Sequence, residues 1–173
     1  MAIHHFDLAR FLTGADPVSV YAREFNPRGS WYRGDAAACC LFEMTGGIVF
    51  SYRGSWCAEG CHTSWQGDWR LIGEKGTLLY ERDESPRGQA VRKAGGFYSE
   101  LKDLKVPVRA MKHGGMHGAL REMLAFLRTG RRPQTECHDN IQSLAMVFAA
   151  IESSRKGKQV PVRTKTKLRE AAN

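Results

Sequence analysis

Apolar side chains recur at helical spacing in three separate stretches of the chain. They lie at residues 3–13, 117–128 and 139–156, where apolar residues return at intervals of three and four. Asp139 or His138 stands near the expected N-cap of the third stretch. Each stretch is followed by a glycine at the position typical of a helix C-cap, namely Gly14, Gly130 and Gly157. The pattern therefore predicts three helices.

Between the first and second helices the pattern changes to the alternation of β-strands. Strand signals, including a short last strand, lie at 18–23, 37–44, 48–57, 69–72, 77–81 and 160–162. Gly46-Gly47 is a strong hairpin signal. Residues 83–115 are rich in glycine, proline and charge, which indicates one or two irregular edge strands with long loops. We expect an α+β fold in which an antiparallel or mixed open sheet of about six strands carries the helices on one face.

The strand at 48–57 raises the question of what covers the other face of the sheet. Its alternation separates one apolar row from one polar row: Ile48, Phe50, Tyr52 and Trp56 against Ser51, Arg53 and Ser55. If the apolar row faces away from the helices, it should be buried against a second copy in a homodimer or higher homo-oligomer. If the polar row faces outward, no partner is needed. The sequence leaves both alternatives open.

Composition and charge exclude several classes of protein. The chain has 173 residues, 42% of them apolar and 25% charged, as in ordinary soluble domains. The net charge of +8 is dispersed along the chain, which argues against a nucleic-acid partner. We expect no membrane partner, because no apolar run approaches the length of a span. Five cysteines without disulfide spacing, and no signal peptide, indicate a cytoplasmic protein with reduced thiols.

The chain shows no sequence feature of a dinucleotide-binding domain. Such a domain needs a strand, a G-x-G-x-x-G turn and a helix, because the pyrophosphate approaches bare backbone at the helix N-terminus. The glycine pairs at 46–47, 95–96 and 114–115 are not part of a β-α-β unit. No P-loop is present either. We therefore expect this chain alone to bind no NAD or NADP.

Several segments, in order along residues 1–162, resemble a known enzyme family. They are Ile3-His4-His5-Phe6-Asp7-Leu8-Ala9-Arg10-Phe11-Leu12-Thr13-Gly14, Asp16-Pro17-Val18-Ser19-Val20, Gly73-Glu74-Lys75-Gly76-Thr77-Leu78, Phe126 to Pro133, and Ala145 to Val162. Together they resemble the C-terminal half of the glucose-fructose oxidoreductase / inositol dehydrogenase (Gfo/Idh/MocA) family. The resemblance implies a dihydrodipicolinate-reductase-like C-terminal domain, with the N-terminal Rossmann half missing from this sequence.

The resemblance also implies a chemistry and a set of site residues. Family members oxidise a secondary alcohol of a sugar or polyol with NAD or NADP, using a lysine, an aspartate and a histidine. The histidine of that signature matches His4. The aspartate is expected four residues before His4, so that the sequence begins inside the motif, and the lysine belongs to the other half. The substrate, and the choice between NAD and NADP, are not fixed by this sequence.

The residues themselves fit the same roles. Removing a hydride from a C–H that carries a hydroxyl also requires a base for the hydroxyl proton, and a histidine suits that task. His4 begins a helix, where the dipole favours a neutral imidazole. Taken without the resemblance, His4 is better explained as a frayed N-terminal residue, and the resemblance reverses that preference. His5 is a candidate substrate-binding residue, and Asp7 is expected to form a local ion pair with Arg10.

Three other groups of residues have side chains that could bind a metal or a substrate. Cys57, Cys61 and His62 offer zinc ligands, but their spacing is not that of a known finger, so ordinary thiols are favoured. A second pair, His113 and His117, would share a helix face only if the helix began before Gly114, so a loop histidine is favoured. We predict no metal site. The third group is aromatic and suits either sugar stacking or the sheet core, with the core favoured: Tyr52, Trp56, Trp65 and Trp69.

Two functions of different class remain. The first is a substrate-binding and oligomerisation domain at 1–162, followed by a basic tail at 163–173, of an NAD(P)-dependent sugar or polyol dehydrogenase that is inactive without its cofactor half. The second is a non-catalytic module for oligomerisation or for binding a small polar ligand. Whether the chain is an enzyme by itself stays open at this stage.

Overall fold

The structure is a computed structural model that describes residues 2–82, 84–108 and 110–164. The chain divides into two compact units. The first unit combines the two ends of the chain, Met1–Ala58 and Glu122–Asn173. The second is the continuous segment Glu59–Arg121. Most of the predicted tail, from residue 165 onward, lies outside the described residues.

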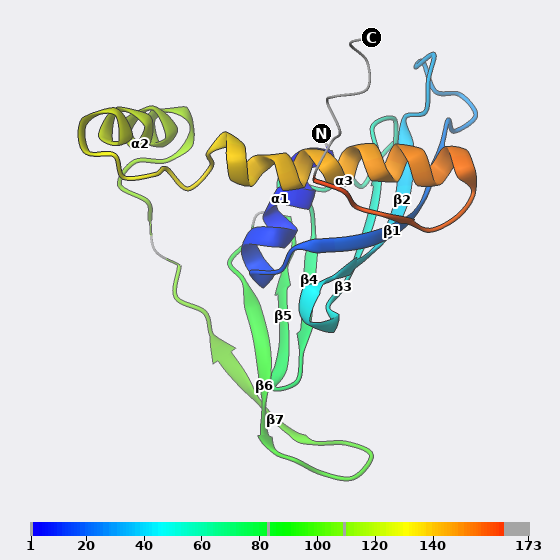
Figure 1. Ribbon diagram of the computed structural model, residues 1–173. Helices are drawn as coiled ribbons and strands as arrows, with labels where there is room; N and C mark the ends of the chain where they lie inside the picture. Colours follow the sequence, from blue (N-terminus) through cyan, green and yellow to red (C-terminus); the bar gives the residue numbers. More distant parts are fainter. Residues whose placement is uncertain (1, 83, 109, 165–173) are drawn as a thin grey trace. The chain divides into compact units, whose positions relative to one another are not determined.

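The first unit is a four-stranded antiparallel sheet with helices on one face (Figure 1). The strands lie in the order β3-β2-β1-β8. The elements of this unit are α1 (Ala2–Thr13), β1 (Pro17–Phe25), β2 (Ala37–Met44), a 3-10 turn (Thr45–Gly47), β3 (Val49–Ser55), α3 (Cys137–Lys156) and β8 (Val160–Pro161). α3 packs along β1 and against α1, so residues from opposite ends of the sequence share one core.

The core lies between this sheet and its two helices. Val20 and Ala22 of β1 alternate inward, and the inward side chains of β2 meet Met146 of α3. The fully buried members include Phe6, Val20, Phe42 and Met146. Burying side chains of this size stabilises the fold by about 1.5–3 kcal/mol each before the entropy of ordering them is subtracted.

Both helices of this unit end as the sequence predicts. Gly14 and Gly157 have left-handed backbone angles, with φ of 64° and 62°, which a glycine adopts without strain. The start of α3 differs from the prediction: Glu136, and neither His138 nor Asp139, is the N-cap residue. Its side chain accepts a hydrogen bond from the Asp139 backbone N–H. The longer glutamate reaches the same amide that Ser or Asp normally caps.

The face of β3 that meets the helices is its apolar one. Phe6 of α1 packs edge to face against Phe42, Phe50 and Tyr52, with ring centroids 4.8, 6.2 and 5.2 Å away. The polar row Ser51, Arg53 and Ser55 is exposed. Of the two alternatives for this strand, the structure therefore shows the outward polar row. The placement of Ile48, Phe50 and Tyr52 on an open face is wrong, because all three pack against the buried core.

The second unit is an antiparallel meander in the order β4-β5-β6-β7. Its strands are β4 (Trp69–Gly73), β5 (Gly76–Tyr80), β6 (Arg87–Lys93) and β7 (Glu100–Lys105). Gly76 opens β5 because a Cβ there would lie 2.2 Å from the carbonyl oxygen of Gln89. α2 (Gly115–Thr129) runs from this segment into the first unit's part of the chain.

The α+β class is confirmed, while the described residues form two four-stranded sheets where the sequence indicated one sheet of about six strands. The two strands beyond these six, β6 and β7, come from residues 83–115, where one or two irregular edge strands were expected. β7 is exposed along its whole length, so its sequence carries no burial pattern to recognise. Among the described residues, no helix is long and apolar enough to cross a membrane.

Candidate functional site

The two predicted site residues lie in the first turns of α1. His4 is exposed and His5 is half-buried. Neighbouring residues of a helix point about 100° apart, so the two rings leave the helix in different directions. The His5 ring faces Tyr52 of β3 at a centroid distance of 5.9 Å and an angle of 45°. His4 is accessible to a ligand, and His5 is placed by the sheet beneath it.

Tyr52, which the sequence placed with the sheet core, packs against that core and also lies beside His5. Its ring lies between α1 and the sheet, and Phe6 packs against it edge to face. Gly54, two residues along the same face, leaves room for it: a Cβ there would lie 2.1 Å from the Tyr52 hydroxyl oxygen. Glycine at position 54 is the only sequence signal for the position of the Tyr52 ring, and it is a weak one.

Burial sets the protonation of the groups beneath the site. It raises the pKa of the Tyr52 hydroxyl, and the neighbouring Cys40 adds to the effect. Burial, assisted by Glu24 and Cys39, also raises the pKa of the Cys40 thiol to about 12. Both groups therefore stay protonated at neutral pH and neither serves as a base or nucleophile there.

A buried arginine fixes α1 to α3. The Arg10 guanidinium donates to the two carboxylate oxygens of Asp139 at 3.0 and 3.2 Å, and to the Ser143 hydroxyl at 3.0 Å. Ser143 in turn donates to the Asp7 carboxylate at 2.6 Å. The predicted pair of Arg10 and Asp7 is confirmed at 3.7 Å, but it is secondary to the bonds with Asp139. Sequence spacing reveals the partner three residues away and not the one 129 residues away.

Arg10 stays charged in spite of its burial. Burial by itself would lower the pKa of the guanidinium, but hydrogen bonds and charge from Asp139 and Asp16 outweigh it and raise the pKa. Only 8% of the Arg10 side chain is exposed. The network therefore holds the helix that carries His4 and His5 in a fixed place over the sheet.

The other residue groups that the sequence singled out lie outside α1. Cys57 belongs to the first unit, whereas Cys61 and His62 belong to the second. The His113 and His117 rings lie 5.0 Å apart, but His113 precedes α2, as the loop interpretation predicted. Cys39 is exposed and Cys40 is buried, because neighbouring side chains of a strand point to opposite faces.

The described residues do not fit a dinucleotide. All strand pairs among them are antiparallel, and neither unit contains the β-α-β turn that delivers backbone N–H groups to a pyrophosphate. Gly46 and Gly47 close the turn between β2 and β3, with φ of 72° and 74°. No step that involves a nicotinamide is therefore assigned to the residues described.

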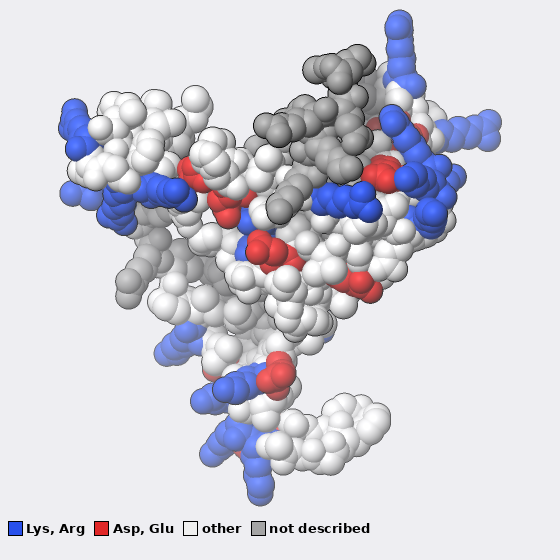
Figure 2. All heavy atoms as spheres, in the orientation of Figure 1, with Lys and Arg blue, Asp and Glu red and all other residues white. Residues whose placement is uncertain are grey.

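Figure 2 shows basic side chains interspersed with acidic ones on the surface of the first unit. One group lies near the C-terminal end of α3, at a shallow hollow lined by Lys156, Lys158 and Arg163 together with Glu152. Lys156 forms an ion pair with Glu152. Groups of this kind, interrupted by acidic residues, differ from the continuous basic surface of a nucleic-acid-binding domain.

Comparison with known proteins relates this architecture to a family. The family described as GFO/IDH/MocA C-terminal domain matches residues 1–79. The uncharacterized protein y4oX of Sinorhizobium fredii is 31% identical over 170 residues, and the match covers 93% of this chain and 45% of that protein. The D-apiose dehydrogenase of Paraburkholderia graminis is 28% identical over 168 residues, covering 95% of this chain and 44% of the enzyme.

Solved structures share the fold. An oxidoreductase from Agrobacterium radiobacter, in complex with NAD+, L-tartaric acid and magnesium, superimposes with a TM-score of 0.71 at 19% identity. That match covers 94% of this chain and 48% of the other. The chain thus spans about half the length of the curated relatives it matches. It belongs to the GFO/IDH/MocA oxidoreductase family and corresponds to the C-terminal domain of that family.

Proposed function

We propose that this chain is the substrate-side domain of an NAD(P)-dependent dehydrogenase that acts on a sugar or polyol. The observation that carries the proposal is the pair of imidazoles on the first turns of α1. His4 is exposed and His5 is set against Tyr52, on a helix that Arg10 fixes to α3. The D-apiose dehydrogenase relative supports a sugar as the class of substrate.

The two histidines divide the work of binding and proton transfer. Oxidation of a secondary alcohol releases the hydroxyl proton together with the hydride, and His4 accepts that proton. It is the exposed member of the pair, so a substrate hydroxyl can approach its ring. His5 orients the substrate through a second hydroxyl. Its packing against Tyr52 restricts its rotation, which lowers the entropy lost when a ligand is bound.

The direct test is a titration of the isolated chain with D-apiose and a panel of other sugars and polyols, followed through the histidine ring signals by NMR. We expect the His4 and His5 signals to shift, with dissociation constants on the order of millimolar for small polar ligands. His4→Asn and His5→Asn should weaken binding, whereas His62→Asn, in the second unit, is the matched control. Shifts spread evenly over all histidines, or none at all, would refute the assignment.

Catalysis itself needs a cofactor half, which can be supplied as a fusion. The dinucleotide-binding half of the D-apiose dehydrogenase, joined upstream of Ala2, provides one. His4→Asn in that fusion should lower kcat by about 100-fold or more, as expected for loss of a general base. The unfused chain should show no calorimetric binding of NAD, NADH, NADP or NADPH. A micromolar dissociation constant for any of the four would contradict this part of the proposal.

A second role, assembly into a homodimer, is supported by the sheet face that α1 and α3 leave open. The exposed apolar side chains on this face are those of Tyr21, Phe25, Leu41 and Val49. They come from neighbouring strands, because Tyr21 pairs with Leu41 and Glu43 pairs with Val49. The proposed dimer surface is thus the one formed by Tyr21, Phe25, Leu41 and Val49. It differs from the row Ile48, Phe50, Tyr52 and Trp56 that the sequence suggested.

Charges on the same face favour a second copy of this chain as the partner. Arg23 and Arg53 flank Cys39 on one side of the Tyr21 and Leu41 row, and Glu43 lies on the other side. A two-fold axis through that row would bring Glu43 of each copy toward the arginines of the other. An obligate interface of this kind buries on the order of 2,000 Å² or more in total.

Light scattering of the purified chain at micromolar concentration measures this assembly. We expect twice the monomer mass of 19.4 kDa. Leu41→Asp should yield the monomer, because it places a charge at the centre of the face, whereas Ile72→Asp in β4 is the control with an exposed apolar side chain in the other sheet. A monomer mass at every concentration would refute the proposed dimer. It would not affect the proposal on substrate binding.

A further inference from the structure

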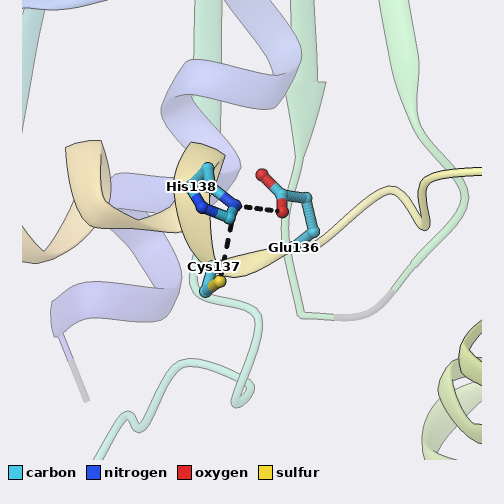
Figure 3. Close-up of side chains that lie close together, drawn as sticks. All are labelled: Glu136, Cys137 and His138. Carbon is cyan, nitrogen blue, oxygen red and sulfur yellow. Dashed lines mark hydrogen bonds and ion pairs between the residues drawn. The ribbon is translucent and has the colours of Figure 1, made fainter.

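The start of α3 brings three different metal-ligand side chains together. Glu136 is the N-cap residue, and Cys137 and His138 are the first residues of the helix. The His138 Nδ1 atom lies 2.8 Å from the Glu136 Oε2 atom and 3.6 Å from the Cys137 Sγ atom (Figure 3). All three donor atoms lie within 4.8 Å of one another. Among the described residues, this is the one such group of three or more donors from His, Cys, Asp and Glu.

The geometry separates a catalytic relay from a metal site. In a Cys–His–acid relay the acid binds one ring nitrogen and the thiol binds the other. Here the carboxylate and the thiol both face the same nitrogen, Nδ1 of His138. A proton cannot be passed from the thiol through the ring to the acid in this arrangement. A cation can instead bind between three donor atoms that lie within 4.8 Å of one another.

The donor spacing is close to that of a tetrahedral zinc site. Zinc bonds of about 2.3 Å to sulfur and about 2.0 Å to nitrogen or oxygen place neighbouring donors roughly 3.3–3.6 Å apart. The distance between Cys137 Sγ and His138 Nδ1 already has this value. The distance between His138 Nδ1 and Glu136 Oε2 would lengthen by about half an ångström when a zinc ion replaced the hydrogen bond. That change needs only a small side-chain rotation.

The glutamate is held by contacts that leave one oxygen available. Glu136 Oε1 accepts the Asp139 backbone N–H at 3.0 Å, while Oε2 faces His138. The Asp139 side chain in turn holds Arg10. Ligands fixed by a surrounding network of this kind bind metal more tightly, because less motion is lost on binding. The site is also accessible: the His138 side chain is 81% exposed and the Glu136 side chain 20%.

We propose that Glu136, Cys137 and His138 form a three-ligand site for zinc or a closely similar divalent transition metal. Sulfur, nitrogen and oxygen donors in one set suit zinc and do not suit magnesium or calcium, which prefer oxygen alone. The fourth position is open to solvent. This site is separate from His4 and His5, and it goes beyond the proposed dehydrogenase function, which needs no metal.

The test is a titration of the untagged, reduced chain with Co²⁺ and then Zn²⁺, read by absorption and by calorimetry. Tetrahedral cobalt bound to a thiolate gives a visible spectrum that zinc should abolish. We expect one ion per chain. Cys137→Ser and His138→Gln should each weaken zinc binding at least 10-fold, as losses of metal ligands do. Glu136→Gln keeps the oxygen that caps α3 and should weaken binding less.

The matched controls are Cys39→Ser, which removes another exposed thiol, and His62→Gln, which removes a histidine of the second unit. Both should retain the affinity of the unsubstituted chain. Hydrogen exchange shows where the metal binds, since bound zinc should slow exchange at the amides of residues 137–139. The proposal is overturned if no thiolate–cobalt spectrum appears, or if Cys137→Ser binds zinc as tightly as the unsubstituted chain.

Discussion

Asp139 offers a sharp test of how α1 is held in place. Its carboxylate accepts hydrogen bonds from Arg10 at both oxygens, at 3.0 and 3.2 Å, and only 8% of the arginine side chain is exposed. Replacing Asp139 with Asn keeps the shape of the side chain and removes its charge. Asp16→Asn is the matched control, because Asp16 reaches the same guanidinium through one contact of 3.3 Å.

The expected magnitude follows from burial. Removing one partner of a fully buried ion pair costs about 3–5 kcal/mol. Asp139 is 57% exposed, so water already weakens the pair, and Asp7 and Asp16 remain near Arg10. We therefore expect Asp139→Asn to lower the free energy of unfolding by about 2 kcal/mol. Asp16 is 61% exposed, and its substitution should cost less than about 1 kcal/mol.

Urea unfolding measures both values, and the thermal midpoint supplies an independent check. A loss of about 2 kcal/mol corresponds to roughly 4–8 °C for a chain of this length. A double-mutant cycle with Arg10→Met should recover most of the Asp139 effect as coupling energy. Equal effects of Asp139→Asn and Asp16→Asn, or a coupling energy near zero, would refute the view that Asp139 is the main partner of Arg10.

Two further predictions concern pKa values raised by burial. Burial first, and then Asp35, raises the pKa of Glu24 above 4.5 in the folded chain, so its ionised form costs stability at neutral pH. Glu24→Gln should therefore raise the urea midpoint at neutral pH, and the gain should shrink as the pH falls through the raised pKa and vanish below 4.5; a gain that persists at low pH would contradict this. The second concerns thiols: a thiol reagent should modify exposed Cys39 in the folded chain and Cys40 only after unfolding, because burial raises the pKa of Cys40 to about 12. Mass spectrometry of partly modified chain would contradict this if it found both thiols modified at the same rate.

Local patterns in the sequence predicted the elements that are held by local interactions. The limits of β2 agree with the predicted 37–44, and the glycines after α1 and α3 end those helices as expected. The second unit was harder, because β6 and β7 carry few apolar residues and are partly or fully exposed. An exposed strand shows no alternation between burial and solvent, and this is the signal on which sequence reasoning depends.

The contents of the candidate site were only partly predictable. His4 and His5 are identified by the resemblance of the first helix to a family segment, whereas Tyr52 joins them only through the pairing of β2 with β3 and the packing of Phe6. The bond between Arg10 and Asp139 joins residues 129 positions apart. Periodicity reports which face of an element is buried, but it does not report which distant residue is packed against that face.

The first unit is built from both ends of the chain, and this determines when it can fold during synthesis. β1 contacts α3 and β8, and these are the last elements of the described chain. At about 5–20 residues per second, a ribosome needs several seconds to add the residues between β3 and α3. During that interval β1 lacks the cover that α3 provides, while the continuous second unit is completed. An apolar surface of β1 therefore stays exposed until α3 and β8 have been synthesised. A chaperone would bind the chain in this state.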